Sequence, residues 1–250
     1  MGKDSQVETT LYNNNNNGVD EAVDVMCRLG WLSQTPKEFR KTVLHRCRLL
    51  NFQKGEPIYQ LNDPPGGLYG LVSGAVRVSL APQERGPYIA HIMHPGNWYG
   101  LAAAVGRQPR TIALTAARQS QLLLLPMTEL EKIVATDPGA WRHFLALAIM
   151  NSNIAISAVD DLLIRSPPKR CVAVLLRLSG LRHASLDRIL PCEVEIRQEE
   201  LAHLSNLSRN ATGTILRSLA KRGFLELDYR HIRIFDPQAL RTILQEDSDV

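Results

Sequence analysis

The stretch from Arg197 to Arg222, RQEELAHLSNLSRNATGTILRSLAKR, constrains the fold more than any other part of the chain. Its first half has Leu201 and Leu204 at helical spacing, which predicts one buried helical face. Asn206 then favours a tight turn, because asparagine tolerates the left-handed backbone conformation. Ser208 is a suitable N-cap for a second helix. The stretch therefore predicts two helices joined by a short turn.

The predicted second helix has one apolar side and one cationic side. Ile215 and Leu219 form its expected buried side. Its other side carries the cationic residues Arg209, Arg217, Lys221 and Arg222. No acid occurs between Ser208 and Arg222. This is the layout of a helix-turn-helix DNA reader, and an ordinary pair of packed surface helices with solvated charges is the alternative.

Positive charge is concentrated in the C-terminal third of the chain. Residues 165–235 carry thirteen Lys and Arg against seven Asp and Glu, whereas the whole chain has 29 against 25. A basic segment attached to a nearly balanced remainder favours a polyanionic partner for that segment. Together with the two-helix stretch, this charge favours double-stranded DNA.

The sequence disfavours several other classes of protein. The four cysteines, at positions 27, 47, 171 and 192, form neither a CxxC pair nor a metal-ligand spacing. Without a secretory signal, we expect a reducing cytoplasm. The apolar run 144–159 is short for a membrane span and carries polar residues 151–153 at its centre. Since no nucleophile–base motif or phosphate-binding loop occurs either, we expect neither an enzyme nor a membrane protein.

The N-terminal half changes from helical to strand patterns. Residues 1–18 contain Asn13 to Asn17 in a row, which predicts a disordered arm. Short helices are expected at 19–32 and 36–46. Apolar runs separated by Gly and Pro between 48 and 126 then predict a β-sandwich or β-roll. Its expected strand cores are Leu71, 75–80, 89–93, 112–114 and 122–125.

A long helix is expected from Asp137 to Arg165, after a short helix at 128–136. Asp137 is a suitable N-cap with Pro138 in the first turn, and residues 166–168, Ser-Pro-Pro, end the helix. An apolar seam repeats along it at alternating spacings of four and three, at Leu145, Ile149, Ser152, Ile156, Val159 and Leu163. Such a heptad seam predicts a dimer interface, and packing on the chain's own sheet is the alternative.

Further elements flank the two-helix stretch. A helix at 169–181 and a strand at 192–196 precede it. After Gly223, apolar residues alternate in two short runs around a turn at 228–230, which predicts a hairpin, or wing. Asp236-Pro237 starts a last short helix.

This order of elements resembles the bacterial Crp/Fnr superfamily of transcription regulators over almost all of the chain after Val19. Two stretches carry the resemblance: QEELAHLSNLSRNATGTILRSLAKRGFLEL followed by HIRIFDPQAL, and PGNWYGLAAAVGRQPRTIALTA, which resembles the phosphate-binding cassette of cyclic-nucleotide-binding domains. The implied fold is α+β. It comprises an N-terminal arm (1–18), a cyclic-nucleotide-binding-like β-roll sensor with flanking helices (19–136), a dimerisation helix (137–165) and a winged helix-turn-helix domain (166–250).

The resemblance implies that the second helix enters the major groove of DNA. Arg209 matches the family's guanine-reading arginine, which can donate two hydrogen bonds to guanine, worth about 1–3 kcal/mol of discrimination. Asn210 and Thr214 stand where the family often has Glu and Arg, which implies a different half-site. Arg217 is expected to contact phosphate or solvent rather than bases. The expected DNA-contacting set is Gln198, Glu199, Ser208, Arg209, Asn210, Thr212, Thr214 and Arg217.

The effector site that the resemblance implies is altered. Gly100 matches a close-approach glycine, and Arg110-Thr111 match a phosphate-binding Arg-Ser/Thr pair. Leu101 replaces the ribose-binding Glu, and an apolar side chain cannot accept a hydrogen bond from a ribose hydroxyl. Asn153 is a candidate substitute for the adenine-reading residues of the long helix. A cyclic nucleotide is the candidate ligand and no other cofactor is expected, while a purely structural role for Arg110 is the alternative.

Two other family chemistries are not favoured. An iron–sulfur cluster needs an N-terminal cysteine group, and only Cys27 and Cys47 lie in that region. His91 and His94 do not match the haem histidine of the CO sensors. The sequence thus predicts a homodimeric regulator that reads a near-palindromic DNA site, responds to an unidentified effector in the β-roll and works with RNA polymerase. A cyclic-nucleotide-binding or partner-binding module whose winged helix is an interaction surface is the alternative.

Overall fold

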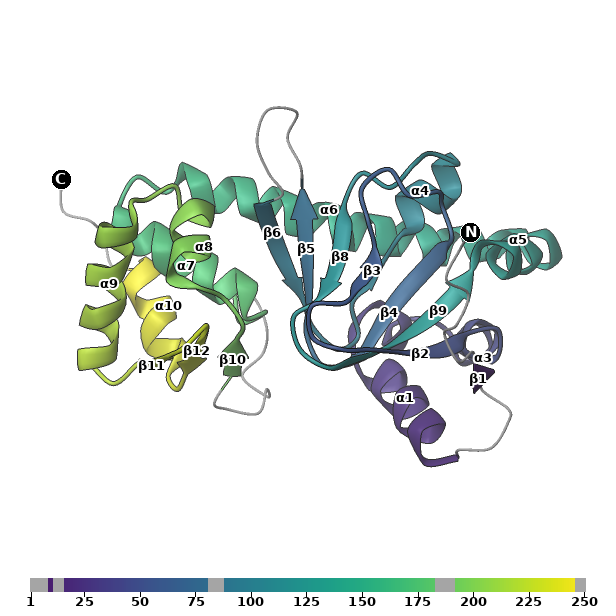
Figure 1. The fold of residues 1–250 in the computed structure, drawn as a ribbon. Coiled ribbons are helices and arrows are strands. Elements are labelled where there is room, and N and C mark those ends of the chain that lie inside the picture. Colours follow the sequence, from purple (N-terminus) through teal and green to yellow (C-terminus); the bar gives the residue numbers. More distant parts are fainter. Residues whose placement is uncertain (1–8, 11–15, 81–87, 183–191, 246–250) are drawn as a thin grey trace, which may run out of the picture. The chain divides into compact units, whose positions relative to one another are not determined.

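The computed structural model describes residues 9–10, 16–80, 88–182 and 192–245. The chain divides into two compact units, residues 1–87 with 93–152 and residues 88–92 with 153–250. Most of the first unit is the predicted sensor, and the second contains the predicted DNA-binding domain. Most elements of both units are labelled in Figure 1.

Three helices open the first unit: α1 (Asn16–Arg28), α2 (Gly30–Ser33) and α3 (Lys37–His45). The single helix expected at 19–32 is therefore interrupted. Gly30 has a φ of 69°, and a Cβ at this position would lie 1.9 Å from the carbonyl oxygen of Gly96. The break is needed because the two backbones approach closely at this point.

The expected disordered arm, 1–18, contains structure in its described part. Residues Thr9–Thr10 form β1, which pairs antiparallel with β2 (Arg48–Phe52). Helix α1 begins at Asn16, three residues before the expected start at Val19, so the helix includes the end of the asparagine run. The rest of the arm lies outside the described residues.

Two antiparallel sheets form the predicted β-roll. One has the order β1-β2-β9-β4-β7 and the other the order β3-β8-β5-β6. The remaining strands are β3 (Pro57–Tyr59), β4 (Gly67–Ser73), β5 (Val76–Leu80), β6 (Tyr88–Met93), β7 (Trp98–Tyr99), β8 (Ala113–Ala116) and β9 (Ser120–Pro126). Every expected strand core coincides with or overlaps one of these strands, which confirms the β prediction. Helix α4 (Leu101–Gly106) lies between β7 and β8 in the chain.

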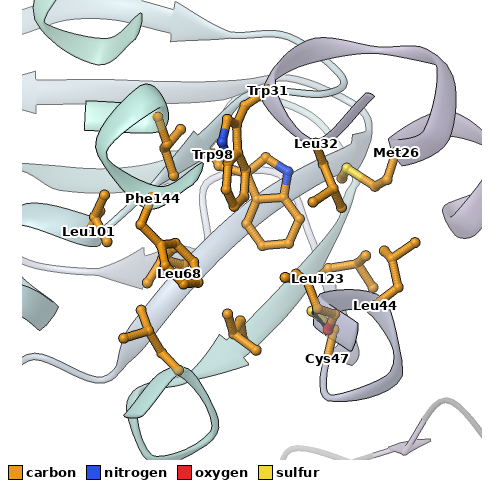
Figure 2. Close-up of a cluster of buried hydrophobic side chains, with 14 of the residues drawn as sticks. Met26, Trp31, Leu32, Leu44, Cys47, Leu68, Trp98, Leu101, Leu123 and Phe144 are labelled. Carbon is orange, nitrogen blue, oxygen red and sulfur yellow. Dashed lines mark hydrogen bonds between the residues drawn. The ribbon is translucent and has the colours of Figure 1, made fainter. Parts of the chain in front are cut away.

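Aromatic side chains form the centre of the first unit's core (Figure 2). The ring centroids of Trp31 and Trp98 are 5.8 Å apart at 79°, and those of Trp31 and Phe144 are 5.7 Å apart. The indole N–H of Trp31 donates to the carbonyl oxygen of His143 over 2.7 Å. The edge-to-face packing of Trp31 on Trp98 and the satisfied indole of Trp31 are favourable for burying Trp31. The core therefore joins α2 and β7 to the start of the long helix.

The long helix begins later than expected. After α5 (Met127–Thr136), the carboxylate of Asp137 accepts a hydrogen bond from the backbone N–H of Gly139 over 2.9 Å. Asp137 thereby caps a short 3₁₀ turn, η1 (Pro138–Ala140), and the α-helix α6 runs from Trp141 to Leu163. The cap was predicted correctly, but 3₁₀ turns are frequent at helix starts and the sequence pattern does not distinguish them.

One side of α6 is apolar and solvent-exposed. The apolar residues of the predicted seam are 52–74 % exposed, namely Leu145, Ile149, Ile156, Val159 and Leu163. Ser152 is also exposed, whereas Phe144 and Leu147 on the other side are buried. The seam is therefore distinct from the side that packs on the first unit.

The second unit contains a winged helix-turn-helix. Helix α7 (Pro167–Leu178) contacts α8 (Gln198–Leu204), α9 (Arg209–Lys221) and α10 (Pro237–Gln245). A three-stranded sheet has the order β10-β12-β11, with β10 (Cys192–Val194), β11 (Leu225–Asp228) and β12 (His231–Ile234). Each of the expected elements is present, and no end is shifted by more than three residues.

Candidate DNA-binding and effector sites

The turn between α8 and α9 has the predicted geometry. Asn206 adopts a φ of 49°, in the left-handed region. The hydroxyl of Ser208 accepts a hydrogen bond from the backbone N–H of Ala211 over 3.2 Å and caps α9. At the start of α8, the carboxylate of Glu200 accepts from the backbone N–H of Arg197 over 2.7 Å. These caps fix both helix starts.

The buried side of α9 is rotated slightly from the expected one. Leu216 and Leu219 are buried, whereas Ile215 is only half-buried. Thr212, which belongs to the expected DNA-contacting set, is fully buried because it lies one turn before Leu216 on the same side. Thr212 therefore contributes to packing and not to the outer surface of α9.

The other expected DNA-contacting residues of α9 lie on its surface. Arg209, Asn210, Thr214 and Arg217 are all exposed, as is the capping Ser208. They place cationic and amide donors on the outer surface of α9. This is the chemistry that reads base edges and holds phosphates.

Gln198 connects α8 to α9. Its side-chain Nε2 donates to the carbonyl oxygen of Arg209 over 2.8 Å. A Cβ at Gly213 would lie 2.4 Å from that nitrogen, so the absence of a side chain at Gly213 makes room for the amide. Gln198 is half-buried and positions the second helix, whereas Glu199 beside it is exposed.

The wing joins β11 to β12 through a turn at Tyr229-Arg230. Arg230 has a φ of 68°, and its guanidinium lies 4.9 Å from the centroid of the Tyr229 ring. Across the sheet, Arg233 pairs with Glu193 over 2.8 Å and with Glu226 over 3.3 Å. These two carboxylates raise the pKa of Arg233. The carboxylates of Glu193 and Glu226 thus neutralise Arg233 on the central strand β12. Arg230 lies at the tip of the wing.

Arg110 of the expected effector site is held inside the first unit. Its side chain donates from Nη1 to the carbonyl oxygen of Gly100 over 3.1 Å and from Nη2 to that of Gly67 over 2.9 Å. The guanidinium lies 4.3 Å from the centroid of the Tyr59 ring. Arg110 is only 2 % exposed. Burial raises the pKa of Tyr59, so its hydroxyl stays neutral beside the cation.

The neighbours of Arg110 fit the expected cassette in part. Gly100 has a φ of 109°, and a Cβ there would lie 2.5 Å from the carbonyl oxygen of Gly67. Gly100 thus lies against the backbone of Gly67, and its expected role toward a ligand stays a prediction. Leu101 is 5 % exposed and belongs to the apolar core. Thr111 is exposed, next to the buried Arg110.

The long helix approaches the cassette through a residue that sequence reasoning missed. Asn151 donates from Nδ2 to the carbonyl oxygen of Trp98 over 3.0 Å. Asn153, the expected effector residue, is exposed. Asn151 lies four residues after the buried Leu147, and that helical spacing was the available signal.

A buried ion pair joins the end of α6 to α7. The carboxylate of Asp161 is fully buried and accepts from Arg177 Nε over 2.8 Å, and Arg182 Nη2 lies 3.2 Å from its other oxygen. Burial raises the pKa of Asp161, while the two arginines oppose the shift. Arg170 also donates to the carbonyl oxygen of Ile164 over 2.7 Å. These contacts fasten the connection between the two helices.

Other chemistries lack support among the described residues. No group of three or more His, Cys, Asp or Glu there could hold a metal ion. Cys171 is buried, and burial raises the pKa of its thiol to about 12. One helical segment, Pro138–Leu163, is long and apolar enough to cross a membrane by length and composition alone. That segment contains the exposed seam of α6.

Two family models match this chain. The model of the cyclic nucleotide-binding domain matches residues 49–137, and that of the Crp-like helix-turn-helix domain matches residues 169–243. The first covers the β-roll and the second covers α7 to α10.

Two relatives match over most of their own length. The CRP-like cAMP-activated global transcriptional regulator of Mycobacterium tuberculosis is 21 % identical over 217 residues, which cover 87 % of this chain and 97 % of the relative. The cyclic AMP receptor protein of Thermus thermophilus is 25 % identical over 195 residues, covering 77 % of this chain and 86 % of the relative.

Solved structures share the fold. FixK2 from Bradyrhizobium japonicum has a TM-score of 0.64 at 21 % identity and covers 78 % of this chain and 96 % of its own. The c-di-GMP-responsive regulator CLP from Xanthomonas campestris has a TM-score of 0.60 at 20 % identity, covering 80 % and 99 %. With both domain types in the family's order, the chain belongs to the Crp/Fnr superfamily of DNA-binding transcription regulators.

Proposed function

We propose that this protein is a cytoplasmic homodimer that binds a near-palindromic DNA site through α9 and regulates transcription together with RNA polymerase. The observation that carries the proposal is the exposed polar surface of α9, with Arg209, Asn210 and Arg217 on a helix whose start is capped and whose other side is buried. A helix presented in this way can enter the major groove.

The exposed seam of α6 supports the homodimer. Its large apolar side chains, spaced as a heptad, form an exposed stripe that a soluble protein buries against a partner. A second copy of α6 offers the same stripe, so the interface is two-fold and self-complementary. A two-fold dimer places one α9 on each half of a near-palindromic site.

We place the regulatory ligand in the β-roll, because the model of the cyclic nucleotide-binding domain matches residues 49–137. In this chain, Arg110 already donates to two backbone carbonyls and stacks on Tyr59. These two bonds use only two of the five N–H donors of the guanidinium, and its buried Nε has no hydrogen-bond partner among the described residues, so Arg110 by itself does not exclude a cyclic phosphate. Leu101 in the core offers no acceptor for a ribose hydroxyl. The apolar Leu101 favours an effector other than cyclic AMP, and a cyclic nucleotide is the alternative ligand.

Three measurements test this function. Selection of bound sequences from a random DNA pool should return a near-palindromic site, and the selected binding should weaken steeply with salt. Sedimentation should give a dimer, and Ile156→Asp should give a monomer that binds DNA weakly. Val105→Asp is the matched control, because Val105 is also exposed and apolar but lies outside the seam. Failure to select any sequence would favour a partner-binding module.

Calorimetric titration with cyclic AMP and cyclic GMP tests the sensor separately. We expect no binding of either at millimolar concentration. Saturable binding of a nucleotide that raises the protein's affinity for DNA would support the nucleotide alternative. An effector acts only by binding one conformation of the protein better than another.

A further inference from the structure

We propose that Arg217 is a base-reading residue that Thr214 orients, so that Asn210, Thr214 and Arg217 act as one specificity-determining unit on α9. The inference rests on the proposed DNA-reading function and assigns a different role to Arg217 from the phosphate contact expected from its sequence position.

The spacing of the three residues places them on one face. Positions 210, 214 and 217 are separated by four and three residues, so they lie one above another along the helix. All three are exposed. Arg217 therefore lies on the same strip of surface as Asn210, which is in the first turn of α9.

A chain of hydrogen bonds fixes the Arg217 side chain. Arg217 donates from Nη2 to the Thr214 hydroxyl over 3.2 Å, and that hydroxyl donates to the carbonyl oxygen of Asn210 over 3.1 Å. Because the hydroxyl proton is committed to the carbonyl, its lone pairs are left to accept from arginine. Thr214 thus acts as a support for Arg217.

The glycine before Thr214 leaves space for the guanidinium. A Cβ at Gly213 would lie 3.2 Å from Arg217 Nη1. The guanidinium therefore folds back by about one helical turn, to the level of Gly213 and Thr214. The bond to Thr214 uses one of its five N–H donors, and the fork geometry suits the O6 and N7 acceptors of guanine.

The two cations at the C-terminal end of α9, Lys221 and the following Arg222, are placed differently. The guanidinium of Arg222 lies 4.5 Å from the centroid of the Phe224 ring, which engages it within the domain. Lys221 is exposed in the last turn of α9, one turn beyond Arg217. Lys221 therefore provides a charge-matched control for Arg217.

The test compares Arg217→Ala, Thr214→Val and Lys221→Ala with the unmodified protein by DNA selection and by affinity for single-base variants of the selected site. We expect Arg217→Ala to lose preference at one base pair in each half-site, by about tenfold, because one bidentate contact is lost. Thr214→Val keeps the side-chain shape but loses the hydroxyl, and should weaken the same preference. Lys221→Ala should weaken all sequences equally.

The double variant distinguishes a supporting role from an independent contact. If Thr214 acts through Arg217, adding Thr214→Val to Arg217→Ala changes the preference no further. A uniform loss across sequences in Arg217→Ala, with a salt slope smaller by about one, would identify a phosphate contact and overturn the inference. An unchanged profile would overturn it as well. If the unmodified protein selects no sequence, the proposed function itself fails.

Discussion

Arg110 and Arg209 carry the same side chain in opposite settings. Arg110 is buried, hydrogen-bonded to two carbonyls and stacked on Tyr59. Arg209 is exposed at the first turn of α9. Arg110 is held by its own protein, although its buried Nε has no hydrogen-bond partner in the part of the chain that the structure describes, whereas Arg209 is exposed to solvent. The comparison teaches that an arginine at a family ligand position can be held in place by its own protein, so its presence alone does not identify a ligand site.

Replacing Arg110 should have the largest effect. Arg110→Ala removes two hydrogen bonds from a charged donor and leaves two carbonyls without it, so we expect a loss of about 3 kcal/mol in the free energy of unfolding. Chemical denaturation measures this. Arg209→Ala is the matched control and should change stability by less than about 0.5 kcal/mol. Equal stability of the two variants would contradict the proposal that Arg110 is structural and Arg209 is not.

Gly100→Ala should also destabilise the sensor. The added Cβ would lie 2.5 Å from the carbonyl oxygen of Gly67 and 2.7 Å from Arg110 Nη1, at a φ of 109°. We expect a cost of about 2 kcal/mol, since L-residues rarely adopt this conformation. Gly223→Ala serves as control, because its φ is also positive but no atom lies within 4 Å of the added Cβ. Similar costs for both would show that backbone strain alone matters.

Arg209→Ala should act on DNA binding instead. We expect a loss of about 1–3 kcal/mol in affinity for the selected site, measured by fluorescence anisotropy. Affinity for unrelated DNA should fall much less, because phosphate contacts supply most of that binding. Unchanged sequence preference would contradict the reading role of Arg209.

The thiol of Cys171 gives the smallest expected effect. Because burial raises its pKa to about 12, the thiol stays protonated at pH 8 and iodoacetamide should not modify it in the folded protein. The half-buried Cys27 is an internal control that should react faster. Mass spectrometry of both peptides measures this. Rapid native alkylation of Cys171 would show that the interior of the DNA-binding domain opens.

Most of the fold could be predicted from the sequence because its signals are local. The turn at Asn206, the cap at Ser208 and the strand pattern of the β-roll each depend on a few neighbouring residues. The break at Gly30 could not be predicted, since it depends on Gly96, which is distant in the chain.

The candidate sites were predicted less completely than the fold. The exposed residues of α9 follow from helical periodicity, but a small rotation buried Thr212. The contacts that hold the Arg110 side chain include Gly67 and Tyr59, both more than forty residues away in the chain. Such tertiary contacts leave no pattern in a single sequence.

The ion pair of Asp161 with Arg177 determines where this protein can be recombined with its relatives. The Ser166–Pro168 segment looks like a natural splice point for exchanging DNA-binding domains. A chimera joined there would take Asp161 from one parent and the position of Arg177 from the other. A mismatch would leave a buried charge without its counter-ion, which costs about 3–5 kcal/mol. A chimera should therefore be joined before Asp161, so that Asp161, Arg177 and Arg182 all come from the same parent.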